Sequence, residues 1–157
     1  INDVHFVVLN SEGMYDEQKE WVSNDLKNTD KKWKVVFFHR GPYGSVYETQ
    51  VVREKWTPIF DEYGVNLVMN GHDHVYLRTY PMKADQQVAN GEGTVYVVGG
   101  SSGPKFYPHT EKPFQEIKLD EQIQVFTAVE INGNKMTVVA KTVDGREVDR
   151  FELTKPR

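Results

Sequence analysis

The sequence predicts an α/β fold in which three parallel strands, joined by two crossover helices, are followed by a largely antiparallel sheet. Two observations support this prediction. Between residues 4 and 70, apolar runs rich in β-branched residues alternate with amphipathic stretches, and such alternation produces parallel sheets through right-handed crossovers. Between residues 75 and 153, strand-like runs follow one another through turn-rich connections, which favours antiparallel pairing.

The three parallel strands are expected at residues 4–9 (VHFVVL), 34–39 (KVVFFH) and 65–70 (VNLVMN). Each run is apolar nearly throughout, which is typical of a strand buried on both faces of a sheet.

The two helices are expected at residues 15–29 and 51–63. The first has acidic residues in its first turn, which suits the helix dipole, and apolar residues such as Trp21 at helical spacing. The second contains Pro58, which should kink or shorten it, and Gly64 is a natural stop.

The second half of the chain predicts a different arrangement. Residues 131–135 (INGNK) favour a hairpin turn, and residues 100–121, rich in Pro and Gly, favour one long surface loop. We therefore expect one domain over residues 1–157, with a βαβαβ part at 1–74 and mainly antiparallel strands at 75–157. The later strands are expected at residues 75–81, 94–100, 123–131, 135–143 and 147–153.

Composition excludes several classes of protein. The net charge of −4 and the scattered Lys and Arg residues lack the basic stripe of a nucleic-acid-binding protein, and no apolar run is long enough to cross a membrane. The chain has no cysteine, so any metal must be held by nitrogen and oxygen ligands. It starts with neither an initiator Met nor a signal peptide, from which we expect a fragment or a processed product.

Three histidines follow neighbouring predicted strands. His39 ends the second strand, and His72 and His74 come directly after the third. Ligands bind outside the carboxyl ends of parallel strands, so these imidazoles predict a metal site there, with Gly71 allowing close approach of the backbone. Taken alone, the pattern also fits a mononuclear three-histidine hydrolase.

Other residues have more ordinary expectations. Asp73 should face away from a metal held by its two neighbours, in a supporting or surface role. His5 and His109 lie outside the group of three and are expected to be structural or exposed. The GGSSG segment at 99–103 favours a turn over a phosphate cradle, because no helix pattern follows it.

Two motifs resemble a known family. Gly71-His72-Asp73-His74 is similar to the GHxH motif of calcineurin-like metallophosphoesterases, and Val36 to His39 is similar to their VxxH motif. The framing segments KWKVVFFHRGPYGS, VNLVMNGHDHVYLRTYP and TVYVVGGSSG resemble the purple acid phosphatase branch. The resemblance implies the C-terminal half of a metallophosphoesterase αββα sandwich.

The resemblance also implies a chemistry. The complete domain would hold two divalent or trivalent metal ions (Fe, Zn or Mn), with His39 and His72 on one ion and His74 on the other. Metal-bound hydroxide would then hydrolyse a phosphate ester. Arg40 and Tyr43, in the loop after His39, are candidates for substrate binding.

The family's earlier motifs, which supply the remaining ligands and the general acid, are absent from this sequence. We therefore expect the missing N-terminal half of the domain to be a partner, and the isolated chain to be inactive and prone to self-association. Family analogy implies an exported protein. The alternative to an enzyme is a non-catalytic binding or structural domain with a degenerate site.

Overall fold

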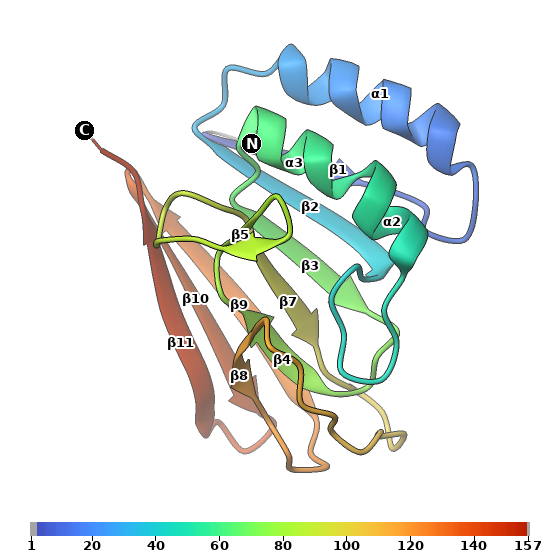
Figure 1. Ribbon diagram of the computed structural model, residues 1–157. Helices are drawn as coiled ribbons and strands as arrows, with labels where there is room; N and C mark the ends of the chain where they lie inside the picture. Colours follow the sequence, from blue (N-terminus) through green and yellow to red (C-terminus); the bar gives the residue numbers. More distant parts are fainter. Residues whose placement is uncertain (1–2, 157) are drawn as a thin grey trace.

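The computed structural model describes residues 3–156, which form three layers (Figure 1). Three helices lie on one face of a six-stranded sheet, and a three-stranded sheet packs on the other face. Within the described residues, no helix has both the length and the apolar character needed to cross a membrane.

The parallel strands form as predicted. β1 (Val4–Val8), β2 (Trp33–Arg40) and β3 (Leu67–Gly71) pair in parallel as neighbours in the six-stranded sheet. The α/β fold class is thus confirmed, and β2 and β3 end at the same edge of the sheet.

A fourth strand extends the parallel part beyond the prediction. β7 (Val95–Gly99) pairs in parallel with β3, whereas the sequence placed it among the antiparallel strands. The reason lies in the chain path: β4 (Tyr76–Thr79) runs back from the end of β3, so the next long strand returns and inserts between them. Strand composition indicates burial but not the direction of pairing.

Short strands complete this sheet and its return loop. β8 (Gln115–Lys118) pairs antiparallel with β4 at the edge, inside the segment that was expected to be entirely loop. β5 (Met82–Lys83) and β6 (Gln86–Gln87) form a small hairpin between β4 and β7.

The three-stranded sheet confirms the predicted antiparallel segment. β9 (Val125–Asn132), β10 (Lys135–Thr142) and β11 (Glu147–Thr154) are arranged in the order β11-β10-β9. The β9–β10 turn contains Gly133 at a φ of 56°, a left-handed conformation that glycine adopts without steric cost.

The helices match the predicted positions with one break. α1 (Tyr15–Lys27) precedes β2, and the second predicted helix is divided into α2 (Gln50–Lys55) and α3 (Thr57–Tyr63). The break at Trp56 comes just before Pro58, which has no N–H for a continuous helix and suits the first turn of a new one.

Two apolar cores hold the layers together. Trp56, Phe60 and Val22 pack between the helices and the sheet, and Trp33, Val97 and Met136 pack between the two sheets. Each of these six side chains is at most 1% exposed. At the edge strand β1, by contrast, Phe6 is 48% exposed and Val8 74% exposed.

A buried ion pair also joins the two sheets. Arg78 of β4 donates from Nε to Asp149 Oδ2 of β11 at 2.7 Å, and the side chains are only 7% and 4% exposed. The Tyr76 hydroxyl donates to the same carboxylate oxygen at 2.9 Å. Burial and this carboxylate together raise the pKa of Tyr76.

Candidate metal centre

The candidate site lies where β2 and β3 end. His39 is the penultimate residue of β2, and His72 directly follows β3. The register of the two strands shifts between Phe37 and Arg40, and such irregularities redirect side chains at a sheet edge. The His39 and His72 rings lie 5.1 Å apart between centroids, at an angle of 77°.

The backbone at the end of β3 is shaped for this approach. A Cβ on Gly71 would lie 3.1 Å from His39 Nδ1, so glycine leaves the room that the His39 ring occupies. His72 has a φ of 63°, the left-handed conformation that non-glycine residues rarely adopt. Strain of this kind concentrates at functional sites, where the surrounding structure maintains it.

Arg40 connects His72 to the loop after β1. Its Nη1 lies 2.9 Å from His72 Nε2, and its Nε donates to Glu12 Oε1 at 2.8 Å. The hydrogen bond from Arg40 lowers the pKa of the Glu12 carboxyl. Burial, followed by the nearby Arg40 and His39, lowers the pKa of His72. The lowered pKa favours the neutral form of the His72 ring.

His74 is fixed by a different segment. Its Nδ1 lies 2.9 Å from the carbonyl oxygen of Lys105, which can only accept a hydrogen bond, so Nδ1 carries the proton. The lone pair then lies on Nε2. Metal-ligating histidines are commonly oriented in this way by a hydrogen bond from the other ring nitrogen.

Two tyrosines that the sequence did not single out border the histidines. The Tyr47 ring lies 5.2 Å from the His72 ring and 5.5 Å from the Tyr107 ring, and Tyr107 lies 4.9 Å from the His74 ring. These contacts join segments far apart in the sequence, so no local pattern reveals them. The long loop predicted from Pro and Gly density was the one available signal for Tyr107.

Asp73 is buried beneath the site and is 2% exposed. Its Oδ2 accepts hydrogen bonds from the backbone N–H groups of Ser45 and Val46, so it holds the loop that carries Tyr47. Asp73 is therefore buried and not on the surface, and the expectation that it faces away from a metal stays a prediction.

Tyr43, a candidate for substrate binding, lies in the core and is 1% exposed. Its hydroxyl donates to Asp85 Oδ1 at 2.8 Å, and its ring packs against Tyr96 and Phe114. Burial first, and then Asp85, raise its pKa. These contacts indicate a packing role, and they lend no support to the predicted contact with substrate, which stays a prediction.

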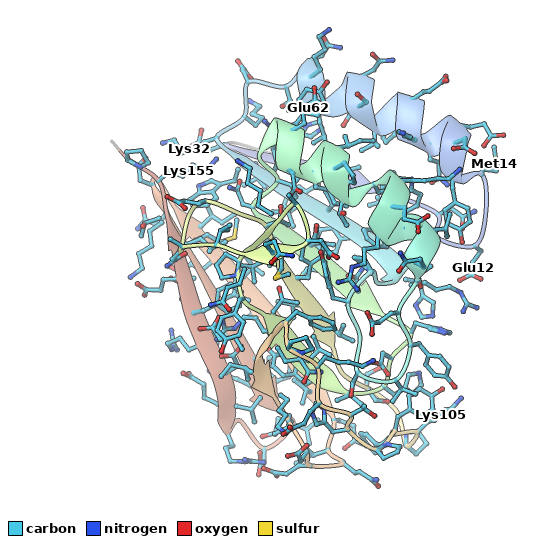
Figure 2. All side chains as sticks on the ribbon, viewed as in Figure 1. Glu12, Met14, Lys32, Glu62, Lys105 and Lys155 are labelled. Atoms are coloured by element: carbon cyan, nitrogen blue, oxygen red, sulfur yellow. The ribbon has the colours of Figure 1, made fainter. Side chains whose placement is uncertain are left out.

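Arg40, the other candidate, borders an open groove of about 450 Å³ together with His72, Tyr47 and Glu48. A more enclosed cavity of about 290 Å³ lies elsewhere, beside Trp33 and Lys155, and no histidine lines it. Figure 2 shows Lys155 and Lys32 on the opposite side of the molecule from Glu12 and Lys105. Of the two hollows, only the open groove is bordered by one of the candidate histidines, His72.

The donor set fits part of a metal site. Within residues 3–156, no three side chains of the His, Asp and Glu types lie close enough together to hold one ion. The structure instead brings His39 and His72 together and keeps His74 apart, with its Nε2 lone pair available. Imidazole nitrogen suits zinc, iron and manganese, and the absence of a side chain at Gly71 leaves room for the His39 ring beside His72.

Comparison with known proteins places this geometry in context. Residues 1–76, which contain all three histidines, match the model of the family described as calcineurin-like phosphoesterase. An acid phosphatase from Aspergillus ficuum is 27% identical over 89% of this chain and 27% of its own length. Purple acid phosphatase 15 from Arabidopsis thaliana is 33% identical over 64% of this chain and 20% of its own length.

A solved structure extends the likeness to the fold. Purple acid phosphatase from yellow lupin (Lupinus luteus) seeds superposes with a TM-score of 0.83 at 22% identity, covering 97% of this chain and 31% of that one. The chain spans only about a quarter of the length of the first curated relatives that it matches.

Proposed function

We propose that this chain, whose first 76 residues match the model of the calcineurin-like phosphoesterase family and which resembles purple acid phosphatases, supplies three histidine ligands to a phosphoesterase centre with two metal ions. His39 and His72 bind one ion and His74 binds the other. The parent protein hydrolyses phosphate esters.

The observation that carries the proposal is the pairing of His39 and His72 beside a separate, oriented His74. The two paired rings are 5.1 Å apart, close enough for one ion to lie between them, while the carbonyl of Lys105 directs the His74 lone pair. When bound, two ions would supply Lewis acidity and an activated nucleophile. The chain's own residues hold the ligands and border the groove where a phosphate ester would bind.

The same geometry argues against the mononuclear alternative. A three-histidine site needs all three imidazoles around one ion, and in the described part of the chain His74 is not grouped with His39 and His72. A non-catalytic binding domain remains the competing function, and it predicts that the histidines can be replaced without loss of activity.

We expect the chain on its own to have little activity. Of the carboxylates close to the histidines, Glu12 is paired with Arg40, and Asp73 accepts two backbone hydrogen bonds through Oδ2, which leaves only its buried Oδ1 without a hydrogen-bond partner. Oxygen ligands for two ions would have to come from other residues of the parent protein. An exported location, expected from family analogy, also stays a prediction.

The test replaces His39, His72 and His74 separately by Ala in the longest chain that contains this sequence. Activity on a phosphate monoester should fall by at least a hundredfold in each variant, on the scale seen when essential catalytic groups are removed. His109→Ala is the matched control, because His109 contacts Ser45 and lies outside the histidine group. Unchanged activity in the three variants would reject the ligand assignments and favour the binding domain.

A further inference from the structure

The contact between Arg40 and His72 uses the one free electron pair of the imidazole. Arg40 Nη1 lies 2.9 Å from His72 Nε2. A guanidinium has only donors, so Nε2 must be the acceptor, and in the neutral ring the proton then sits on Nδ1.

A metal ion cannot bind His72 while this contact lasts. An ion at Nε2 would take the position of the guanidinium. An ion at Nδ1 would require the proton to leave Nδ1. The neutral ring would then carry its proton on Nε2, and this N–H would face the N–H of Arg40. Metal binding and the Arg40 contact exclude each other at either nitrogen.

We infer that Arg40 is a latch that closes His72 in the metal-free chain and must move away before His72 can hold an ion. This role presupposes the metal site proposed above and adds a regulatory element to it. Arg40 thereby lowers the apparent affinity of the site for metal, because binding must first break its hydrogen bond to the ring.

Hydrogen bonds hold Arg40 on one side, and on the other side it borders the open groove, which leaves room for its side chain to move. Glu12 accepts from Arg40 Nε at 2.8 Å, and the Ser11 hydroxyl accepts from the Arg40 backbone N–H at 2.8 Å. The Arg40 side chain is 40% exposed and borders the open groove of about 450 Å³. It can therefore leave His72 while keeping its ion pair with Glu12.

The test is a titration of Zn²⁺ into four proteins: the wild-type chain and the variants Arg40→Met, His72→Ala and Lys112→Met. The affinity of each protein for Zn²⁺ is measured by competition with a chromophoric chelator. Arg40→Met should bind Zn²⁺ roughly tenfold more tightly, the scale of losing one charge-assisted hydrogen bond and one like charge. Lys112→Met also removes a positive charge near the groove, where Lys112 pairs with Glu48, yet it has no contact with a ring nitrogen. It should change the affinity by less than about twofold, because it removes a positive charge but no hydrogen bond to His72.

A second measurement reports on the ring directly. Nitrogen NMR shifts of His72 in the metal-free wild type should show the proton on Nδ1, and Arg40→Met should move the population toward the Nε2–H form. A merely structural role for Arg40 would not change this tautomer.

The outcomes separate the latch from the site itself. If His72→Ala binds Zn²⁺ as tightly as the wild type, His72 is not a ligand and both proposals fail. If His72→Ala weakens binding but Arg40→Met does not tighten it, or if the wild-type ring carries its proton on Nε2, the latch alone is wrong.

Discussion

Replacing Asp73 by Ala should release the loop that carries Tyr47. The Asp73 carboxylate accepts from the N–H groups of Ser45 and Val46. Ser45 is 1% exposed, so its N–H would be left without a partner, whereas Val46 is 39% exposed and its N–H can reach water. A buried donor that loses a charged acceptor costs about 1–3 kcal/mol, and we expect a total loss of about 2–3 kcal/mol.

Two measurements test the expected loss of stability in Asp73→Ala. Urea unfolding should show the loss in Asp73→Ala, while Asp16→Ala, which removes an exposed carboxylate, should stay within about 0.5 kcal/mol of the wild type. If the lost stability belongs to the loop alone, hydrogen exchange at the Ser45 amide should be about 30- to 150-fold faster, since 1.4 kcal/mol corresponds to about tenfold.

The reasoning fails if Asp73→Ala loses less than about 0.5 kcal/mol or if exchange at Ser45 is unchanged. Either result would mean that the two backbone amides do not depend on the carboxylate. A faster exchange at Ser45 together with weaker Zn²⁺ binding would show that the loop also positions the ring of His72, through Tyr47.

Three further predictions concern stability, pH and association. Asp149→Ala leaves the buried Arg78 without its main partner and should lower the free energy of unfolding in urea by about 3–5 kcal/mol. The double variant Arg78→Met with Asp149→Leu should recover most of this loss. A double variant as unstable as Asp149→Ala would contradict the prediction. Burial and then Lys118 lower the pKa of His109 below its ordinary 6.5, so the unfolded chain takes up the proton first as pH falls. Stability should therefore decrease as pH falls below 6.5, until the folded state is protonated as well, and His109→Gln should flatten that part of the pH profile; a slope that persists in the variant would refute it. Val8, 74% exposed on the edge strand β1, favours self-association, which light scattering should detect at high concentration and Val8→Lys should reduce; a monomer at every concentration would be the opposite result.

The strands with continuous apolar runs could be predicted because a strand that is buried on both faces is apolar at nearly every position. Residues 4–9, 34–39 and 65–70 correspond to β1, β2 and β3 with shifts of one or two residues at their ends. The direction of β7 was not predictable, since its run of VYVVG suits a buried strand of either orientation. β8 was missed because it is short, lies at an edge and has polar residues at three of its four positions, QEIK.

The site was predictable to the extent that it depends on strand ends. His39, His72 and His74 could be chosen from the sequence because each follows or ends a buried strand, and their role as ligands stays a proposal. The contacts of Arg40 with His72 and of Tyr107 with His74 could not be predicted, because both join segments more than 30 residues apart. Tyr43 shows the opposite case. Its position in the loop after a candidate ligand suggests contact with substrate, yet tertiary packing buries its side chain.

The tripeptide His72-Asp73-His74 contacts two segments of the chain, the end of β2 with the loop after it and the loop after β7. His72 contacts Arg40 at the end of β2, Asp73 binds the backbone of the loop after β2, and His74 donates to Lys105 in the loop after β7. Adjacent residues can contact different segments because their side chains leave the backbone in different directions. Inserting or deleting one residue here would exchange the positions of the proposed ligands and of Asp73, so the packing of the loops requires this spacing whether or not a metal is bound.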